Sequence, residues 1–272
     1  MSLLTIIIPV RNCEKYIQET LSALKTIKDS KILIADGNSS DKTIEIIKDF
    51  QNQNMNIEII SEKDDGQSDA LNKLIQFVET PFFLWLNADD LINSKFIRFA
   101  CDQIDLLDKD DIKEVISITS NSVFIDENSN FVKYQYALQD NSFLVKNGIW
   151  FGKFPCRIWN TDLVRKAGGL NKDLFYSMDF DLLRRQYLDN KRLKTIHSRK
   201  FMGAFRLHNN SKTGNPSNTP LVQDEMNKLL KRNKIEIAIA KFISMMLRVA
   251  SVNYIFYRFF GKFFTTKDND IF

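Results

Sequence analysis

A polar cluster at residues 87–90 directly follows five apolar residues at 82–86. A short apolar run is typical of a buried parallel strand, so the cluster would lie at a strand's carboxyl end, where open α/β sheets bind ligands. The adjacent carboxylates of Asp89 and Asp90 repel each other unless a positive charge offsets them. A hard cation such as Mg²⁺ or Mn²⁺, shared with substrate phosphates, would do so. Alternatively, one of the two aspartates caps the next helix.

The composition narrows the class of protein. The chain has 272 residues, a net charge of +4 and three widely spaced cysteines. This length fits one large domain, with or without an appendage, and the small charge does not favour a nucleic-acid partner. An odd cysteine count fits neither a disulfide framework nor a zinc site. There is no signal-peptide pattern and no apolar stretch of the roughly 20 residues that span a bilayer. We therefore expect a cytoplasmic protein.

Strand and helix patterns alternate over the first 90 residues. The expected strands are at residues 4–10, 31–35, 57–60 and 82–86, and the expected helices are at 14–26, from 39–41 onward, and at 68–78. This order predicts βαβ units and a parallel sheet, with Asn12 as a cap of the first helix. Polar residues recur where the loops leave the strands, and these loops should gather along one edge of the sheet.

The turn after the first strand argues against two classes of nucleotide-binding enzyme. Residues 9–12 read Pro-Val-Arg-Asn and lack the glycine-rich turn of a dinucleotide or triphosphate cradle. A sugar-phosphate nucleotidyltransferase, which would need such a loop here, remains only an alternative. A nucleotide would instead be held by side chains and a metal.

Seven segments occur in an order that resembles the inverting family 2 glycosyltransferases. They are residues 5–12, 34–43, 61–73, 86–90, 168–170, 178–184 and 205–213. The resemblance covers about residues 3–215 and implies the GT-A fold, a mainly parallel Rossmann-like α/β sheet flanked by helices. It implies transfer of a sugar from a nucleoside-diphosphate sugar, UDP being the expected nucleotide, to an acceptor hydroxyl with inversion. Bacterial surface polysaccharide synthesis would be the setting.

The resemblance also implies a domain division. Residues 1–215 would form the catalytic domain, with a nucleotide-sugar half at about 1–92 and an acceptor half at about 93–215. Residues 216–272 would form a C-terminal helical segment.

Residues of three loops would bind the nucleotide by this resemblance: Pro9, Arg11, Asp36, Asp64 and Gln67. Asp36 would bind the base, because a carboxylate can accept the N3–H of uracil. Alternatively, Asp36 forms a turn before Gly37, and residues 64–66 form an ordinary solvated turn.

The metal, Mn²⁺ or Mg²⁺, would be held by Asp89 and His208. The family's metal motif commonly begins with aspartate, whereas this chain has Asn87, followed by Ala88. An asparagine can donate to a ribose hydroxyl but carries no charge, so Asp89 should do most of the metal binding, with residues 87 and 88 beside the nucleotide. By resemblance His208 completes the site from a loop over the donor, although a lone histidine is often structural.

Phosphate neutralisation also departs from the family's pattern. Many relatives have an arginine where this chain has Leu71. The diphosphate must then be neutralised by the metal, Arg11 or Lys212. Arg206, His208, Ser211 and Lys212 cluster within seven positions, a composition that suits contacts with phosphate and metal.

The acceptor hydroxyl needs a general base, and Asp179 and Asp181 are the candidates. Asp179 matches the family's base, whereas Asp181 is expected to cap the helix or to pair with Arg184 or Arg185. One base without a protein nucleophile implies single displacement with inversion. Alternatively, both carboxylates merely start a helix. Many relatives have glutamate at Met178, and this change, with Asn87, leaves open a catalytically weakened relative that only binds a nucleotide sugar.

The chain beyond residue 234 combines regularly spaced basic residues with many apolar and aromatic ones. Lys234, Lys241 and Arg248 are seven positions apart and would share one helix face. This composition is typical of basic amphipathic helices on a membrane surface. The protein would then lie on the inner face of the cell membrane, where its saccharide acceptor could be lipid-linked. Alternatively, these helices cover the catalytic domain or form a dimer seam.

Overall fold

A computed structural model describes residues 4–27, 30–53, 55–137, 139–149, 155–190, 192–212, 214–231, 236–239, 242–243 and 245–246. The strands are β1 Leu4–Val10, β2 Lys31–Asp36, β3 Ile57–Ser61, β4 Phe82–Trp85, β5 Leu91–Ile92, β6 Val115–Ile125, β7 Phe131–Gln135, β8 Arg157–Asn160 and β9 Lys194–Arg206. The helices are α1 Ile17–Leu24, α2 Thr43–Asn52, α3 Gln67–Gln76, α4 Ser94–Asp105, α5 Lys109–Glu114, α6 Ser142–Lys146, α7 Thr161–Lys166, α8 Met178–Asp189 and α9 Thr219–Leu229, with a 3₁₀ turn at Pro216–Asn218.

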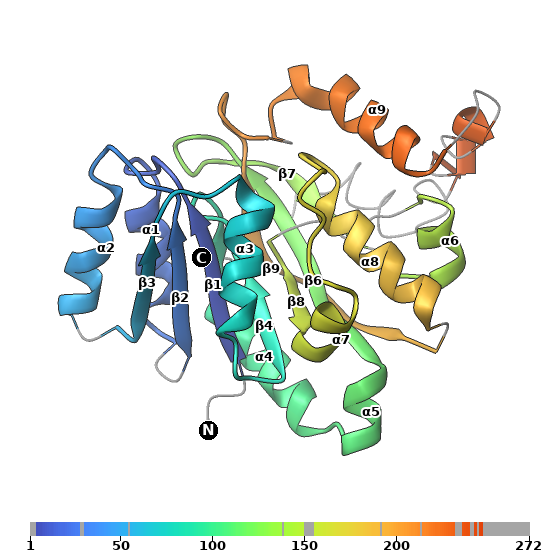
Figure 1. The fold of residues 1–272 in the computed structure, drawn as a ribbon, viewed down its shortest axis with the longest axis horizontal. Helices are drawn as coiled ribbons and strands as arrows, with labels where there is room; N and C mark the ends of the chain where they lie inside the picture. The colour runs from blue at the N-terminus through green and yellow to red at the C-terminus, as the bar shows by residue number, and fades with distance from the viewer. Residues whose placement is uncertain are drawn as a thin grey trace.

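The strands form one sheet in the order β3-β2-β1-β4-β8-β6-β9-β5, and β7 pairs with β6 (Figure 1). The first four pair in parallel, as predicted from the alternating pattern. Beyond β4 the sheet is mixed, because β8 runs antiparallel to both β4 and β6 while β9 runs parallel to β6. The prediction of a mainly parallel sheet is therefore correct for the first half and incomplete for the second.

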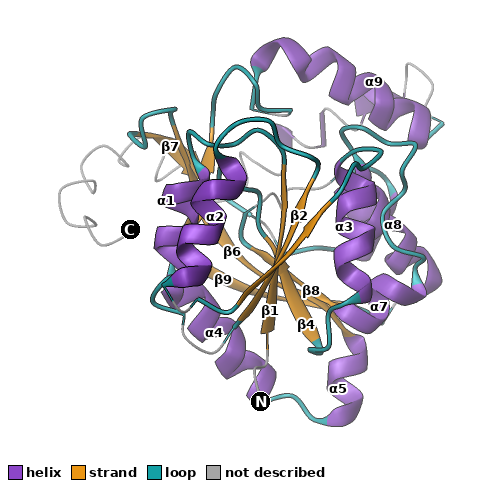
Figure 2. Ribbon diagram, turned by 60° about the vertical axis from the view of Figure 1, so that its left-hand side comes forward, coloured by secondary structure: helices purple, strands orange, loops and turns teal. Residues whose placement is uncertain are grey.

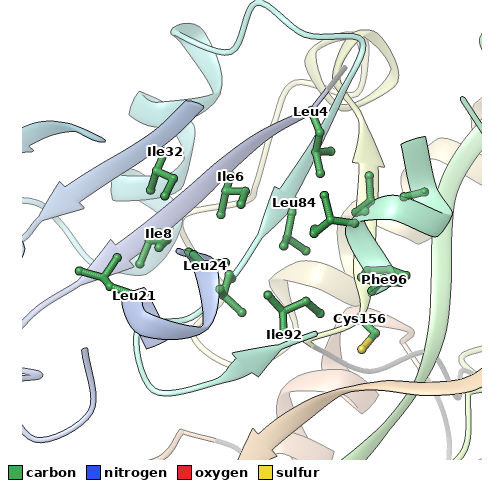
Figure 3. Close-up of a cluster of buried hydrophobic side chains, with 14 of the residues drawn as sticks. Leu4, Ile6, Ile8, Leu21, Leu24, Ile32, Leu84, Ile92, Phe96 and Cys156 are labelled. Atoms are coloured by element: carbon green, nitrogen blue, oxygen red, sulfur yellow. The ribbon is translucent and has the colours of Figure 1, made fainter. Parts of the chain in front are cut away.

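Helices cover both faces of the sheet, with α1, α2 and α4 on one side and α3, α7 and α8 on the other (Figure 2). Successive residues of a strand point to opposite faces, so Ile6 and Ile8 lie in one core cluster and Ile7 lies in the other. Figure 3 shows the first cluster, where Ile6 and Ile8 lie with Leu21 of α1. Burial on both faces explains why β1 reads as a continuous apolar run.

Asn12 does not cap the first helix, contrary to the prediction. It has a φ of 49°, a left-handed conformation that asparagine tolerates well. Its Oδ1 accepts a hydrogen bond from the backbone N–H of Ser40 at 2.8 Å, and its own N–H donates to Ser39 Oγ at 2.8 Å. Helix α1 begins only at Ile17 and has no side-chain cap. Asn12 therefore joins the loops that follow β1 and β2.

Helix α9 contacts the rest of the chain although it follows residue 215. Its Met226 and Leu229 pack against the core cluster that holds α3 and α8. Among the described residues, no helix is both long and apolar enough to cross a lipid bilayer.

Candidate active site

The loops at the carboxyl ends of β1 and β2 meet the loop before α3. A Cβ atom placed on buried Gly37 would lie 2.5 Å from Asp64 Oδ2 and 3.4 Å from Arg11 Cδ. Glycine at this position therefore allows two predicted nucleotide-binding side chains to approach the backbone that follows Asp36. The backbone N–H of Gly37 also donates to the carbonyl of Val10, next to Pro9, at 2.9 Å.

Asp36 is buried at the end of β2, with 1% of its surface exposed. Its carboxylate accepts hydrogen bonds from the backbone N–H of Ser39, 3.2 Å from each oxygen, and from Ser61 Oγ at 2.8 Å. Asp36 thus orders the loop between β2 and α2. Its contact with a base stays a prediction.

Asn87 is the centre of a side-chain network. Its Oδ1 accepts hydrogen bonds from Gln67 Nε2 at 2.9 Å and Trp85 Nε1 at 3.1 Å, and its Nδ2 donates to Asp90 Oδ2 at 3.0 Å. An aspartate here would place a second carboxylate against Asp90 and could not donate that bond. Asparagine in place of the family's usual aspartate therefore suits the buried carboxylate of Asp90, to which it donates a hydrogen bond.

The two adjacent aspartates have different environments. Asp90 is 1% exposed, and its oxygens accept from the backbone N–H of Arg206 at 2.9 Å and from Asn87. Burial, and then the charge of Asp89, raise the pKa of Asp90 well above its ordinary value. Ala88 is also buried, and its carbonyl accepts a bond from Thr20 Oγ1 at 2.8 Å. Asp89 is the member of this motif whose carboxylate reaches the surface, with 25% of its side chain exposed.

The structure brings together the two predicted metal ligands. His208 Nε2 lies 2.8 Å from Asp89 Oδ2, although the residues are 119 positions apart in the chain. The His208 ring is 4.9 Å from the ring of Tyr16 between centroids. The imidazole thus rests beside a buried aromatic ring of the loop before α1, which the sequence did not indicate.

This donor set fits a divalent ion that is shared with a nucleotide. Among the described residues, no three or more histidine, cysteine and acidic side chains form a group that could hold a metal. Asp89 and His208 offer one carboxylate and one imidazole, both partly exposed. Mg²⁺ and Mn²⁺ commonly take one or two protein ligands and complete their shell with phosphate oxygens and water.

Arg206 does not face this site, which corrects its predicted place among the phosphate-binding residues. Its side chain is fully buried, with Nε donating to the carbonyl of Asp89 at 2.8 Å and Nη2 to Glu19 Oε2 at 2.7 Å. Ser211, of the same predicted cluster, is buried too and donates to the Arg206 carbonyl at 3.2 Å. Arg206 thus supports the backbone at Asp89, and Ser211 supports the backbone at Arg206, from the buried side of the site.

Lys212 lies over Phe175, with Nζ 4.0 Å from the ring centroid. Burial lowers the pKa of Lys212 to about 8, and the nearby charges of Glu225 and Asp64 oppose this shift. The cation therefore lies close to Asp64, in the loop before α3, and to the segment before α8. The described structure gives it no anionic ion-pair partner within 4.0 Å.

Asp179 lies in the first turn of α8, partly buried between buried Met178 and Phe180. Its Oδ1 accepts from the backbone N–H of Phe180 at 2.8 Å. The Met178 sulfur accepts from Ser68 Oγ at 2.8 Å, which joins α8 to the start of α3 next to Gln67. The beginning of α8 therefore lies close to Gln67, one of the predicted nucleotide-binding residues.

Asp181 has the pairing that the sequence predicted. It is 4% exposed, and its Oδ2 accepts from Arg185 Nε at 2.8 Å. The two candidate bases therefore differ in environment. Asp179 is partly exposed, whereas Asp181 is buried in an ion pair with Arg185.

Glu225 of α9 is a residue that sequence reasoning missed. Its carboxylate accepts hydrogen bonds from the backbone N–H groups of Phe175 (2.7 Å), Tyr176 (2.9 Å) and Ser177 (2.6 Å). It follows the expected end of the catalytic domain at residue 215, and no local pattern marks it as different from other helix glutamates.

Known proteins share this fold. The Glycosyl transferase family 2 model matches residues 5–167. Staphylococcus aureus TarS residues 1–349, solved with UDP-GlcNAc, superposes with a TM-score of 0.62 at 18% identity, covering 94% of this chain and 73% of that one. The mannosyltransferase PcManGT from Pyrobaculum calidifontis, solved with GDP-Man and Mn²⁺, has a TM-score of 0.59 at 12% identity, covering 92% and 75%. These structures establish a GT-A-like fold.

Two curated proteins are related in sequence. Chondroitin synthase of Escherichia coli is 26% identical over 186 residues, which are 66% of this chain and 26% of that protein. The teichoic acid poly(glycerol phosphate) polymerase of Staphylococcus epidermidis is 33% identical over 155 residues, which are 54% and 21%. The match thus spans about a quarter of the first relative's length and about a fifth of the second's. Because the family model matches more than half of the chain, this protein belongs to glycosyl transferase family 2.

Proposed function

We propose that this protein transfers a sugar from a UDP-sugar to an acceptor hydroxyl by single displacement with inversion. A divalent ion bound by Asp89 and His208 would assist the reaction, and Asp179 would act as the general base. The observation that carries the proposal is the 2.8 Å contact between Asp89 and His208 beside the carboxyl ends of parallel strands.

The chemistry of the site supports a metal-assisted departure of the nucleotide. A bound Mn²⁺ or Mg²⁺ would act as a Lewis acid on the leaving diphosphate. Asp89 and His208 would hold such an ion, while Arg206 keeps the Asp89 backbone in place. Lys212 and Arg11 would add positive charge near the phosphates, a need that the buried apolar Leu71 increases.

The nucleotide would lie across the loops after β1 and β2. Gly37 leaves room beside Asp64 and Arg11, and Asp36 orders the loop that would surround the base. Asp64, Gln67, Asn87 and Ala88 would complete the wall of this pocket. TarS binds UDP-GlcNAc and PcManGT binds GDP-Man, so the fold accommodates more than one base. We propose UDP because a carboxylate at position 36 suits the uracil N3–H.

The acceptor would approach from the side of α8. Asp179 is partly exposed there and could accept the proton. Asp181, the other candidate base, is held in an ion pair with Arg185. Removal of the acceptor proton by one base, without a protein nucleophile, would invert the sugar's configuration. The sequence relatives that make teichoic acid and chondroitin support a saccharide or lipid-linked saccharide acceptor in bacterial surface polymer synthesis.

Membrane association of the C-terminal segment is part of this proposal. Ile239, Phe242 and Met245 are 53%, 59% and 53% exposed, and a spacing of three would place them near one face if the segment is a continuous helix. The basic residues of this prediction, Lys234, Lys241 and Arg248, lie outside the described residues, as does the whole stretch at 247–272. Deletion of residues 235–272 should release the protein from anionic liposomes, and wild-type protein that fails to co-sediment would contradict membrane binding.

Calorimetry with UDP and Mn²⁺ tests the metal site. Asp89→Ala and His208→Ala should abolish or strongly weaken Mn²⁺-dependent UDP binding while circular dichroism stays unchanged. Asp110→Ala, which removes an exposed carboxylate paired with Lys113 on α5, is the control. Undiminished Mn²⁺-dependent affinity in Asp89→Ala would exclude the proposed site.

Transfer assays test the base separately. Asp179→Asn should keep donor affinity within a few-fold and lose about 10²-fold or more in transfer rate. Asp181→Asn, on the same helix, should instead lower stability and retain transfer per folded molecule. Reversed results would exchange the two roles. Metal-dependent binding without turnover by the wild type on any acceptor would favour the catalytically weakened relative.

A further inference from the structure

We infer that Glu225 is a positioning residue for Asp179, acting from α9 on the segment just before α8. The inference rests on the proposed role of Asp179 as general base and adds a part of the chain that lies beyond the family match at residues 5–167.

Glu225 holds three consecutive backbone N–H groups. One oxygen accepts from Phe175 at 2.7 Å, and the other accepts from Tyr176 at 2.9 Å and Ser177 at 2.6 Å. Hydrogen bonds from neutral donors to a carboxylate are shorter and stronger than those between neutral groups. A negative charge ahead of a helix N-terminus also interacts favourably with the helix dipole. The carboxylate therefore clamps the chain immediately before α8.

The start of α8 has no comparable anchor of its own. Ser177, its N-cap residue, makes no side-chain capping bond. Its Oγ is buried and has no hydrogen-bond partner in the described structure. Serine usually caps a helix through this oxygen, so an anchor from another element replaces the local one. The backbone that leads into α8 is then held by α9, in addition to the bond from Ser68 Oγ to the Met178 sulfur in the first turn.

Asp179 lies two positions after the last N–H that Glu225 holds. Its carboxylate accepts from Phe180 N within the same turn, so its direction follows the backbone of that turn. Misplacement of a reacting group by about 1 Å can cost about 10²-fold in rate. Loss of the clamp should thus slow transfer without removing any group that binds the donor.

The clamp is itself supported from both sides. Met226 and Leu229 of α9 pack against the core cluster that contains Phe180, and α9 lies over α8 in the ribbon view (Figure 1). Lys212 stacks on Phe175 and lies close enough for Glu225 to raise its pKa. One carboxylate therefore connects α9, the segment before α8 and the loop after β9.

Glu225→Gln tests the inference, with Asp224→Asn as the matched control. Glutamine keeps the size of the side chain, but its amide nitrogen would face a backbone N–H and at least one bond would be lost. Asp224, the neighbouring residue on α9, pairs with Lys228 and is 59% exposed, so its variant removes the same charge without touching the segment. Both proteins are compared with the wild type in Mn²⁺-dependent UDP affinity, transfer kinetics and amide hydrogen exchange.

In Glu225→Gln we expect kcat to fall about 10- to 100-fold, UDP affinity to stay within two-fold and the amides of residues 175–177 to exchange faster. Asp224→Asn should match the wild type. The UDP-binding stoichiometry reports the folded fraction, so a purely structural loss would lower stoichiometry and rate together. If the glutamine variant does not fold, Glu225→Asp takes its place in the test. Because aspartate keeps the charge, its transfer rate should lie between that of the wild type and that of the glutamine variant.

The possible failures are distinct. Wild-type kcat per binding site in Glu225→Gln, or unchanged exchange at residues 175–177, would overturn the positioning role and leave the proposed function intact. A wild type that neither binds UDP with Mn²⁺ nor transfers sugar would instead overturn the proposed function, and with it the inference.

Discussion

Replacing Lys212 by arginine is expected to remove a pH dependence of UDP affinity that the wild type shows above about pH 8. Burial lowers the pKa of Lys212 to about 8, while Glu225 and Asp64 hold it above what burial alone would give. The charged ammonium exists below this pKa. If it neutralises the diphosphate, affinity must be lost as the pH rises through about 8.

The size of the effect follows from the fraction of charged amine. A group with a pKa of about 8 is about 90% charged at pH 7 and about 10% charged at pH 9. Apparent UDP affinity should therefore fall about tenfold over this range. Bound diphosphate would raise the pKa of Lys212 in the complex. The loss of UDP affinity therefore begins at the Lys212 pKa of the free protein. Arginine stays charged throughout.

Calorimetry with UDP and Mn²⁺ at about pH 7, 8 and 9 provides the assay. Titration of the uracil ring and of metal-bound water affects the wild type, Lys212→Arg and Lys212→Met equally. A difference in the pH dependence of their UDP affinity therefore reports the titration of Lys212. Lys212→Met should bind weakly at every pH. Lys228→Arg, at an exposed lysine of α9, is the control. Equal pH dependence in the wild type and Lys212→Arg would refute the reasoning.

Two further predictions concern Arg206 and Asp36. Arg206→Met removes bonds to the Asp89 carbonyl and to Glu19 and should lower the free energy of unfolding by about 2–4 kcal/mol, less than for a fully buried pair because Glu19 can be hydrated. Urea denaturation measures this, and a loss below about 1 kcal/mol would contradict a structural role. Asp36→Ala should weaken UDP binding and reduce its preference over GDP; equal binding of UDP and GDP by the wild type would argue against uracil recognition.

Much of the first half of the fold could be predicted from the sequence. The apolar runs that became β1, β2 and β4 are local signals, because a strand buried on both faces needs apolar residues in succession. The polar loops after them were predicted to converge, and Gly37, Asp64 and Arg11 do lie together. The mixed second half was not predicted, because strand direction there depends on which neighbours pair rather than on a local pattern.

The roles of individual residues at the site were harder to predict from the sequence than the strands were. The sequence suggested Asp89 and His208 as metal ligands through resemblance. It suggested Asp181 as a helix cap or as a partner of Arg184 or Arg185, and the structure shows Arg185, four residues along the helix. Spacing could not show that Arg206 would be buried while Lys212 would stand near the nucleotide loops. Both are basic residues of one short stretch, and only the packing of β9 against the motif at residues 87–90 separates them.

The sequence by itself therefore determined the parallel βαβ half, its edge of polar loops and the identity of the carboxylates available there, because these depend on periodicity and residue chemistry within short segments. Only the tertiary structure decided which groups meet. Asp89 reaches His208 across 119 positions, and Glu225 reaches the start of α8 across 48. Such contacts arise when distant segments are packed on the same sheet, and no local pattern records the direction from which a partner will come.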